Sequence, residues 1–209
     1  MRKLLFLFLT IMVSGCTTTE MTGFLDPQYK NHQISKVVVR AHGATLEETL
    51  TAEQKFAEKL NTHNVNTIKF TDIAPPTRKY TLAQEAKLLK KTGADSLFTV
   101  YVARKDSVES YVPPTYHAGK TTSTVNMAGN MAYISSHTTP GYTTGGYSVS
   151  SPIMATFSSL VDLRNGNEIW RGEGYSSGAS SYLDLLLNAG ESAIADMGEK
   201  GLLSKEKRK

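Results

Sequence analysis

The chain has 209 residues, of which 40% are hydrophobic, and it carries a formal net charge of +4 at pH 7. This length is sufficient for one domain with a substantial core. The excess positive charge comes from the two ends, namely Arg2 and Lys3 and the basic segment 205–209, so the composition does not favour a nucleic-acid-binding face.

Residues 1–15 have the features of a secretory signal peptide. Arg2 and Lys3 are followed by an apolar run at positions 4–13 and then by two small residues. The run is about half the roughly 20 residues that a bilayer-spanning helix needs, and no later segment is apolar for as long. We therefore expect an exported protein whose mature part has no membrane-spanning helix.

The sequence Val13-Ser14-Gly15-Cys16 resembles the bacterial lipobox, in which an aliphatic residue and two small residues precede a lipidated cysteine. The resemblance implies cleavage after Gly15, a diacylglyceryl thioether on Cys16 and an N-acyl chain such as palmitate, which together anchor a protein stably. Thr17 is not the aspartate that marks inner-membrane retention in enteric bacteria, which favours a lipoprotein on the periplasmic face of the outer membrane. The alternative is a plain signal peptide followed by an unmodified cysteine.

Residues 16–33 are predicted to be the lipidated N-terminus and a short tether. They lack a helical period and contain Gly23, Pro27 and Asn31, which favour turns. An α/β domain is expected at 34–203. The basic tail at 204–209 is interpreted as solvated, with contact to anionic lipid or a cell-wall polymer as the alternative.

The first half of the domain alternates between strand and helix patterns. Helices are predicted after Thr45 and Thr81, where Glu48 and Gln84 complete capping boxes ahead of apolar stripes. Three segments rich in β-branched or apolar residues are predicted as strands. They are residues 34–41, 66–73 and 96–105. The βαβαβ order predicts parallel neighbouring strands with right-handed crossovers.

Residues 106–152 form a predicted insertion of different composition. They are rich in Thr, Ser, Gly, Tyr and Pro, and no acidic residue occurs between Ser110 and Leu160. Such a long segment is usually functional or disordered, and alternation at 121–125 and 131–134 favours an extended hairpin. Tyrosines suit interfaces, so five of them are candidate partner-binding residues. These are Tyr111, Tyr116, Tyr133, Tyr142 and Tyr147. A mobile loop without a partner is the alternative.

The second half of the domain is predicted to contain a β-hairpin and a terminal helix. Strands at 155–163 and 168–175 flank Asn165-Gly166, a strong hairpin signal, and Trp170 is interpreted as a core residue. Ser181 is the expected cap of a helix with a buried apolar stripe. The complete fold prediction is one α/β domain with a mixed sheet, helices packed on it, and a long insertion.

The sequence shows no recognisable catalytic or metal site. The histidines are scattered, and neither a G-x-S-x-G elbow nor a phosphate-binding loop is present. Cys16 is the single cysteine, so lipidation leaves no thiol for chemistry. His42-Gly43, at the carboxyl end of the first strand, comes closest to a ligand site, but a turn is the favoured interpretation. We expect a non-enzymatic protein with no metal and no cofactor beyond the lipid.

Two segments carry a family resemblance. They are Thr92-Gly93-Ala94-Asp95, which leads into an apolar strand, and VDLRNGNEIW at 161–170, which is followed by the last helix. They resemble periplasmic lipoproteins with the fold of the TolB amino-terminal domain, a group that includes the curli secretion-channel lipoprotein and the lipoprotein activators of peptidoglycan synthases. The resemblance covers 34–105 and 153–203. It implies a non-catalytic envelope protein that works through contacts.

Three functions follow as hypotheses. The first is a lipid-anchored periplasmic interaction or assembly protein that uses residues 106–152 to bind another envelope protein or a second copy. The alternative is a subunit of an oligomeric outer-membrane secretion channel, although Thr, Ser and Gly occupy too many positions for lipid-facing strands. A cell-wall hydrolase ranks below both. Its candidate carboxylates, Glu47, Glu48, Glu53 and Asp72, are too dispersed to predict a cleft.

Overall fold

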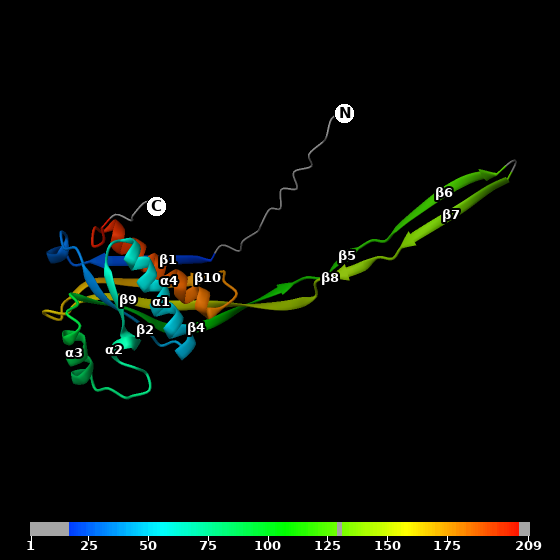
Figure 1. Ribbon diagram of the computed structural model, residues 1–209. Coiled ribbons are helices and arrows are strands. Elements are labelled where there is room, and N and C mark those ends of the chain that lie inside the picture. Colours follow the sequence, from blue (N-terminus) through cyan, green and yellow to red (C-terminus); the bar gives the residue numbers. More distant parts are fainter. Residues whose placement is uncertain (1–16, 129–130, 205–209) are drawn as a thin grey trace, which may run out of the picture. The chain divides into compact units, whose positions relative to one another are not determined.

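The computed structural model describes residues 17–128 and 131–204 and divides the chain into two compact units (Figure 1). One unit, here called the domain, comprises the described residues up to Ser107 and from Pro152 onward. The other, Val108–Ser151, is here called the arm. This boundary confirms that the segment of different composition is an insertion in an α/β domain.

The domain is built on a mixed six-stranded sheet. In spatial order its strands are β1 (Thr18–Leu25), β10 (Glu168–Ser177), β9 (Tyr147–Asp162), β4 (Ser96–Val112), β2 (Lys36–His42) and β3 (Asn66–Lys69). Strand β2 is parallel to both β3 and β4, as the βαβαβ pattern predicts. Strand β10 pairs antiparallel with β9 and with β1.

Helices cover the β2 region of the sheet on both faces. The described helices are α1 (Leu46–Thr62), α2 (Phe70–Ile73), α3 (Leu82–Lys91) and α4 (Tyr182–Glu199), with a 3₁₀ turn, η1, at Pro27–Tyr29. The predicted capping boxes at Thr45 and Thr81 are present, and Ser181 caps α4. Among residues 17–128 and 131–204, no helix combines the length and apolarity needed to cross a membrane.

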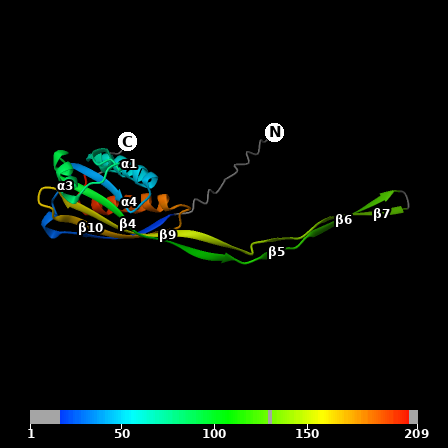
Figure 2. The ribbon, with the colours of Figure 1, turned by 90° about the horizontal axis from the view of Figure 1, so that it is seen from below.

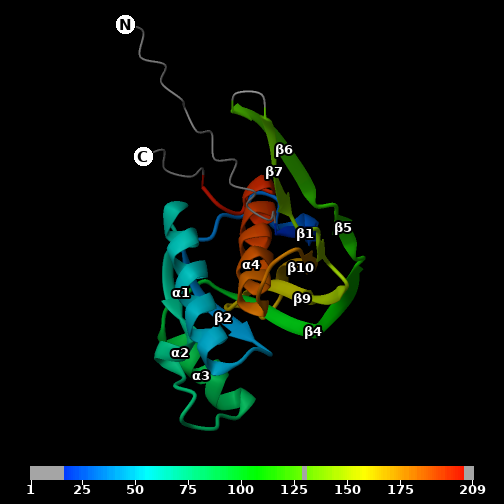
Figure 3. The same cartoon turned by 90° about the vertical axis from the view of Figure 1, so that its right-hand side faces the viewer.

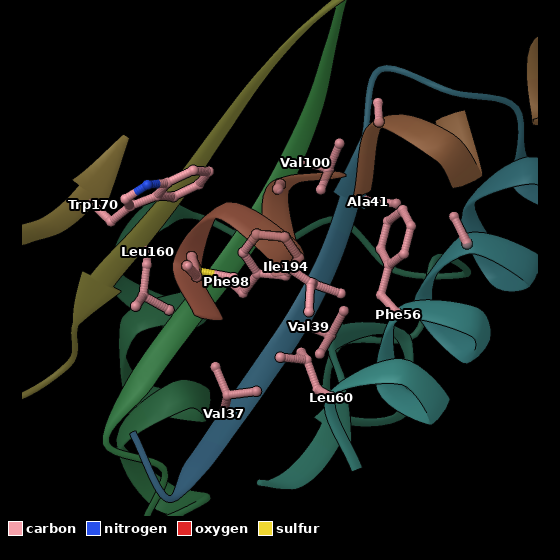
Figure 4. Packing of buried hydrophobic residues seen from close by; sticks show 14 of the residues in the cluster. Val37, Val39, Ala41, Phe56, Leu60, Phe98, Val100, Leu160, Trp170 and Ile194 are labelled. Atoms are coloured by element: carbon pink, nitrogen blue, oxygen red, sulfur yellow. The ribbon is translucent and has the colours of Figure 1, made fainter. Parts of the chain in front are cut away.

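The main core lies between the sheet and the pair α1 and α4, which run side by side (Figure 3). Val37 and Val39 of β2 face Phe56 and Leu60 of α1, and Ile194 of α4 closes the cluster (Figure 4). Side chains of a strand alternate between faces, so Val38 belongs to a second cluster with residues of α2 and α3. Strand β2 is therefore buried on both faces.

A glycine allows α1 and α4 to approach each other closely. A Cβ atom on Gly190 of α4 would lie 2.0 Å from Cε1 of Phe56, far inside van der Waals contact. The Phe56 ring is fully buried and makes an edge contact with Phe98 of β4, with 6.2 Å between the ring centroids. The ring therefore occupies the space that any larger residue at position 190 would need.

The Thr92-Gly93-Ala94-Asp95 motif joins α3 to β4 and ties β4 to β2. The Asp95 carboxylate accepts backbone N–H groups of Ser35 and Lys36 at 2.9 and 3.0 Å and the Ser96 hydroxyl at 2.7 Å. Burial alone would raise the pKa of Asp95, but the hydrogen bonds from Ser96, Ser35 and Lys36 outweigh it and lower that pKa.

The predicted hairpin between β9 and β10 is confirmed, with Gly166 at φ 79° in its turn. Arg164 donates to both oxygens of Asp162, at 2.9 and 2.7 Å, and the hydrogen bonds from Arg164 lower the pKa of Asp162. Trp170 is confirmed as a core residue that is 1% exposed, and its Nε1 donates to Asp196 of α4 at 2.7 Å.

The tether prediction for residues 16–33 is wrong at residues 18–25. Thr18–Leu25 form β1, an edge strand hydrogen-bonded to β10. Gly23, interpreted from the sequence as a turn residue, instead provides clearance, because a Cβ there would lie 2.0 Å from Oδ2 of Asp196 and 2.7 Å from Nε1 of Trp170. The domain thus begins close to Cys16, which itself lies outside the described residues.

The strand predicted at 66–73 is too long by four residues. Strand β3 ends at Lys69, and Phe70–Ile73 form the single turn α2. The buried Glu53 carboxylate of α1 accepts the backbone N–H of Thr71 at 3.0 Å and its hydroxyl at 2.8 Å, which satisfies the start of the turn. The guanidinium of Arg40 lies 4.3 Å from the Phe70 ring centroid.

Candidate functional site

The arm is a two-stranded ribbon interrupted at matching points on its two strands. Its short pair is β5 (Thr115–His117) with β8 (Tyr142–Thr144), and its long pair is β6 (Lys120–Ala128) with β7 (Met131–Thr139). Pro113-Pro114 stands opposite Gly145-Gly146 at the first interruption, and Ala118-Gly119 opposite Pro140-Gly141 at the second. Proline lacks an N–H for the ladder, which explains why pairing stops at these points.

The glycines at the interruptions are required by the backbone. Gly145 and Gly146 have φ of 87° and 75°, where glycine is strongly favoured. A Cβ on Gly145 would lie 2.2 Å from the Pro113 carbonyl oxygen, and one on Gly119 would lie 2.3 Å from that of Thr139. The Pro and Gly content that marks this segment in the sequence therefore shapes a defined ribbon.

The hairpin β6–β7 pairs over nine residues in an unbroken antiparallel register. Figure 2 shows its two strands in the arm. The hairpin predicted from the alternation at 121–125 and 131–134 is thus confirmed. Two cross-strand hydroxyl pairs support it, Thr121 with Thr138 at 3.0 Å and Ser123 with Ser136 at 2.8 Å. Every described side chain of β6 and β7 is solvent-exposed.

The five candidate tyrosines are spread along the arm and do not form one cluster. Tyr111, Tyr116, Tyr142 and Tyr147 are 57–69% exposed, so their rings are available to a partner. Tyr133 lies opposite Asn126 in the β6–β7 register, and its side chain is outside the part that the structure describes.

Tyr116 and Tyr142 lie on opposite faces of the short pair β5–β8. Tyr142 is opposite His117 in the register and stacks on its ring, with 4.7 Å between the centroids, while Tyr116 is opposite Thr143. The His117 ring nitrogen Nε2 is also 3.0 Å from the Thr144 hydroxyl. The histidine thus belongs to an aromatic contact on one face of the ribbon.

The sequence reasoning missed a group of apolar side chains on the long hairpin. Val125, Met127 and Ile134 are 60%, 74% and 72% exposed, and Val125 pairs directly with Ile134. Directly opposed residues share a face, and Met127 is two positions from Val125, so all three side chains lie on the same face. The alternation in 121–127 was the signal that could have identified this apolar patch.

The region around His42-Gly43 is a turn beside an open groove of about 480 Å³. Gly43 has φ 80°, and the His42 ring stacks on Tyr101 with 5.6 Å between the centroids. The groove is also lined by Arg40, which forms an ion pair with Glu85 at 3.1 Å. The polar groups here are engaged in holding β2, α1 and α3 together, as the turn interpretation predicts.

Glu53 is the one carboxylate of the hydrolase hypothesis that is fully buried. Its oxygens accept hydrogen bonds from Thr71 and from the backbone N–H of Ala41, at 3.3 Å in the latter case. Burial raises the pKa of Glu53, although these hydrogen bonds oppose the shift. Its contacts join α1, α2 and the end of β2, which is a structural role.

Glu48 and Asp72 also form contacts of their own, although the negative charge of Asp72 helps to raise the pKa of Glu53. Glu48 completes the α1 cap and binds Lys105 at 2.7 Å, and Asp72 lies 3.6 Å from Lys69. In residues 17–128 and 131–204, no group of three His, Cys, Asp or Glu side chains is placed to hold a metal ion.

No family model and no curated protein matches the sequence. Among solved structures, the PelC dodecamer from Paraburkholderia phytofirmans is 12% identical, with 90% of this chain and 100% of that chain covered at a TM-score of 0.48. Lipoprotein GNA1162 from Neisseria meningitidis is 16% identical, with 78% and 99% covered at a TM-score of 0.39. Likenesses this distant do not assign a function.

Proposed function

We propose that this protein is a lipid-anchored, non-catalytic interaction or assembly protein of the bacterial cell envelope, held at the periplasmic face of the outer membrane. Its partner-binding surface is the arm. The observation that carries the proposal is the β6–β7 hairpin, whose nine residue pairs present only exposed side chains in the described part of the chain. A ribbon with exposed apolar side chains is suited to binding a partner.

The position of the anchor supports this proposal. Strand β1 begins at Thr18, two residues after Cys16, so lipid on Cys16 holds the edge of the sheet within about 7 Å of the attachment point. Thr18 pairs with Ser177, and Ser176 pairs with Met154, two residues from the arm boundary at Pro152. The start of β1 and the first domain residues of β9 therefore lie at the same end of the sheet.

The arm can be tested without dismantling the domain. The Gly146 N–H donates to the Val112 carbonyl at 2.8 Å, so the two strands are adjacent there, and Asn-Gly can replace residues 113–146 as a two-residue turn. The lipidated wild type and this variant are compared by in-cell cross-linking and mass spectrometry. We expect the variant to fold, to reach the membrane and to lose cross-linked envelope partners. Unchanged partner recovery would refute the proposal.

The anchor is tested separately with Cys16→Ala. We expect the variant to leave the membrane fraction and to lose the mass of the lipid group. The secretion-channel hypothesis remains the alternative. It predicts ring-shaped particles of the lipidated protein in detergent by electron microscopy, and a strictly monomeric particle would argue against it.

A further inference from the structure

The outer edges of the β6–β7 hairpin are unprotected against strand addition. These two strands form a sheet of their own, with no third strand from the described chain beside either of them. Natural edge strands are usually short, bulged, or interrupted by lysine or proline. Strand β7 runs for nine residues without a proline, lysine or register shift, and β6 carries only Lys120, at its first position.

The edges of the domain sheet are protected in the usual ways. At one edge, β3 has only four residues and ends at Lys69, after which the chain turns into α2. At the other, β1 carries the charged residue Glu20. Strand β7 of the arm, by contrast, is neither short like β3 nor does it carry a charged residue such as Glu20 of β1.

An isolated two-stranded hairpin is at best marginally stable in water, whereas three or more strands with an apolar face are stable. Added strands would extend the patch of Val125, Met127 and Ile134 into a wider apolar face. The hairpin thus gains backbone hydrogen bonds and cross-strand side-chain contacts from a neighbouring strand.

Charge indicates what the neighbouring strand is. The arm contains two charged residues, Glu109 and Lys120, and is neutral overall when its histidines are neutral. It therefore has no charge complementarity for a strongly acidic or basic partner, and two copies do not repel each other. A two-fold interface brings identical surfaces together, and an antiparallel pair of identical strands satisfies that symmetry.

We propose that β7 of one copy pairs antiparallel with β7 of a second copy, centred on Ser135, so that two arms form one four-stranded sheet. Ser135 is the midpoint of Met131–Thr139, and this register pairs all nine residues of each strand. Strand β7 is the edge that lacks a lysine. This inference rests on the proposed function and identifies the partner of the arm as a second arm.

The direct test is disulfide trapping in the full-length lipidated protein. Cys16 is the only native cysteine and is occupied by lipid in the proposed state, so Ser135→Cys introduces a single thiol per copy. Thr124→Cys is the matched control, because Thr124 lies opposite Ser135 on β6 and is also exposed. We expect Ser135→Cys to form a covalent dimer in cells and Thr124→Cys to remain monomeric. No dimer, or equal dimer from both variants, would overturn the proposal.

A charge-exchange test uses the same position. Ser135→Lys and Ser135→Glu each place like charges opposite each other in the paired strands, so each variant alone is expected to lose self-association when differently tagged copies are co-purified. Co-expression of the two variants is expected to restore it, which misfolding would not allow. If these tests fail while replacement of 113–146 still removes envelope partners, the arm binds a different protein. If dimers form but that replacement removes no partner other than the second copy, the arm serves self-association alone and the proposed binding of other envelope proteins is wrong.

Discussion

The substitution Gly190→Ala tests the packing of α1 against α4 because two physical effects predict opposite signs. Alanine in a helix interior is favoured over glycine by about 1 kcal/mol. The new methyl group, however, would lie 2.0 Å from Cε1 and 2.2 Å from Cζ of Phe56. That ring is fully buried and makes an edge contact with Phe98.

Overpacking of a filled core typically costs about 1–3 kcal/mol, and a contact this short belongs at or beyond the upper end of that range. We therefore expect Gly190→Ala to lower the free energy of unfolding by roughly 1–2 kcal/mol after the helix-propensity gain is included. Urea denaturation of a protein that begins at Thr17 measures this free energy of unfolding. An increase of about 1 kcal/mol, the propensity effect alone, would refute the steric argument.

Phe56→Leu provides the matched control for this substitution. It shortens the ring that blocks position 190, so the double variant should recover part of the loss, with a coupling energy of about 1 kcal/mol or more in the double-mutant cycle. Strict additivity of the two single changes would contradict direct contact between these residues.

Three further predictions concern other parts of the molecule. Gly23→Val should destabilise the domain by at least about 2 kcal/mol in urea unfolding, because its Cβ would overlap the Asp196 carboxylate. An unchanged free energy of unfolding would indicate that β1 can shift to accommodate the valine side chain. Since the pKa of Asp95 is lowered in the folded state, its contribution is present above its ordinary value of 3.8 and is lost as the pH falls below it. The free energy of unfolding of Asp95→Asn should therefore decrease less steeply than that of the wild type as the pH is lowered. An unchanged pH dependence would contradict this prediction. Tyr116→Ser and Tyr142→Ser should weaken partner cross-linking without changing the unfolding midpoint; a shifted midpoint would instead indicate a structural role.

Local patterns in the sequence were sufficient for most of the domain. Two capping boxes, an Asn-Gly turn and the burial of Trp170 follow from short-range chemistry, and each is present in the structure. The parallel order of β2, β3 and β4 also follows, because a crossover helix between strands leaves little choice.

The errors arose where distant residues decide the local structure. Gly23 has the composition of a loop, but it lies in β1 because Trp170 and Asp196, far along the chain, need the space of its missing side chain. Likewise, β3 ends at Lys69 because the buried Glu53 holds Thr71 in a helical turn. Neither contact has a signal in the nearby sequence.

The arm was partly predictable. Its boundaries follow from composition and its hairpin from alternation, but the pairing of the Pro-Pro and Gly-Gly interruptions depends on a register that composition does not contain. The tyrosines are predicted from residue type alone. The alternation in 121–127 places Val125 and Met127 on one face, whereas the position of Ile134 on that face depends on the register.

The central claim is that the arm is the surface through which a lipid-anchored protein meets its partners. Site-specific photo-cross-linking tests it most directly, with the photoreactive residue placed at Tyr116 in the arm or at Leu82, which is 85% exposed on α3. In cells that retain the lipid anchor, we predict covalent adducts from position 116 and none from position 82. Adducts from position 82 alone would contradict the account.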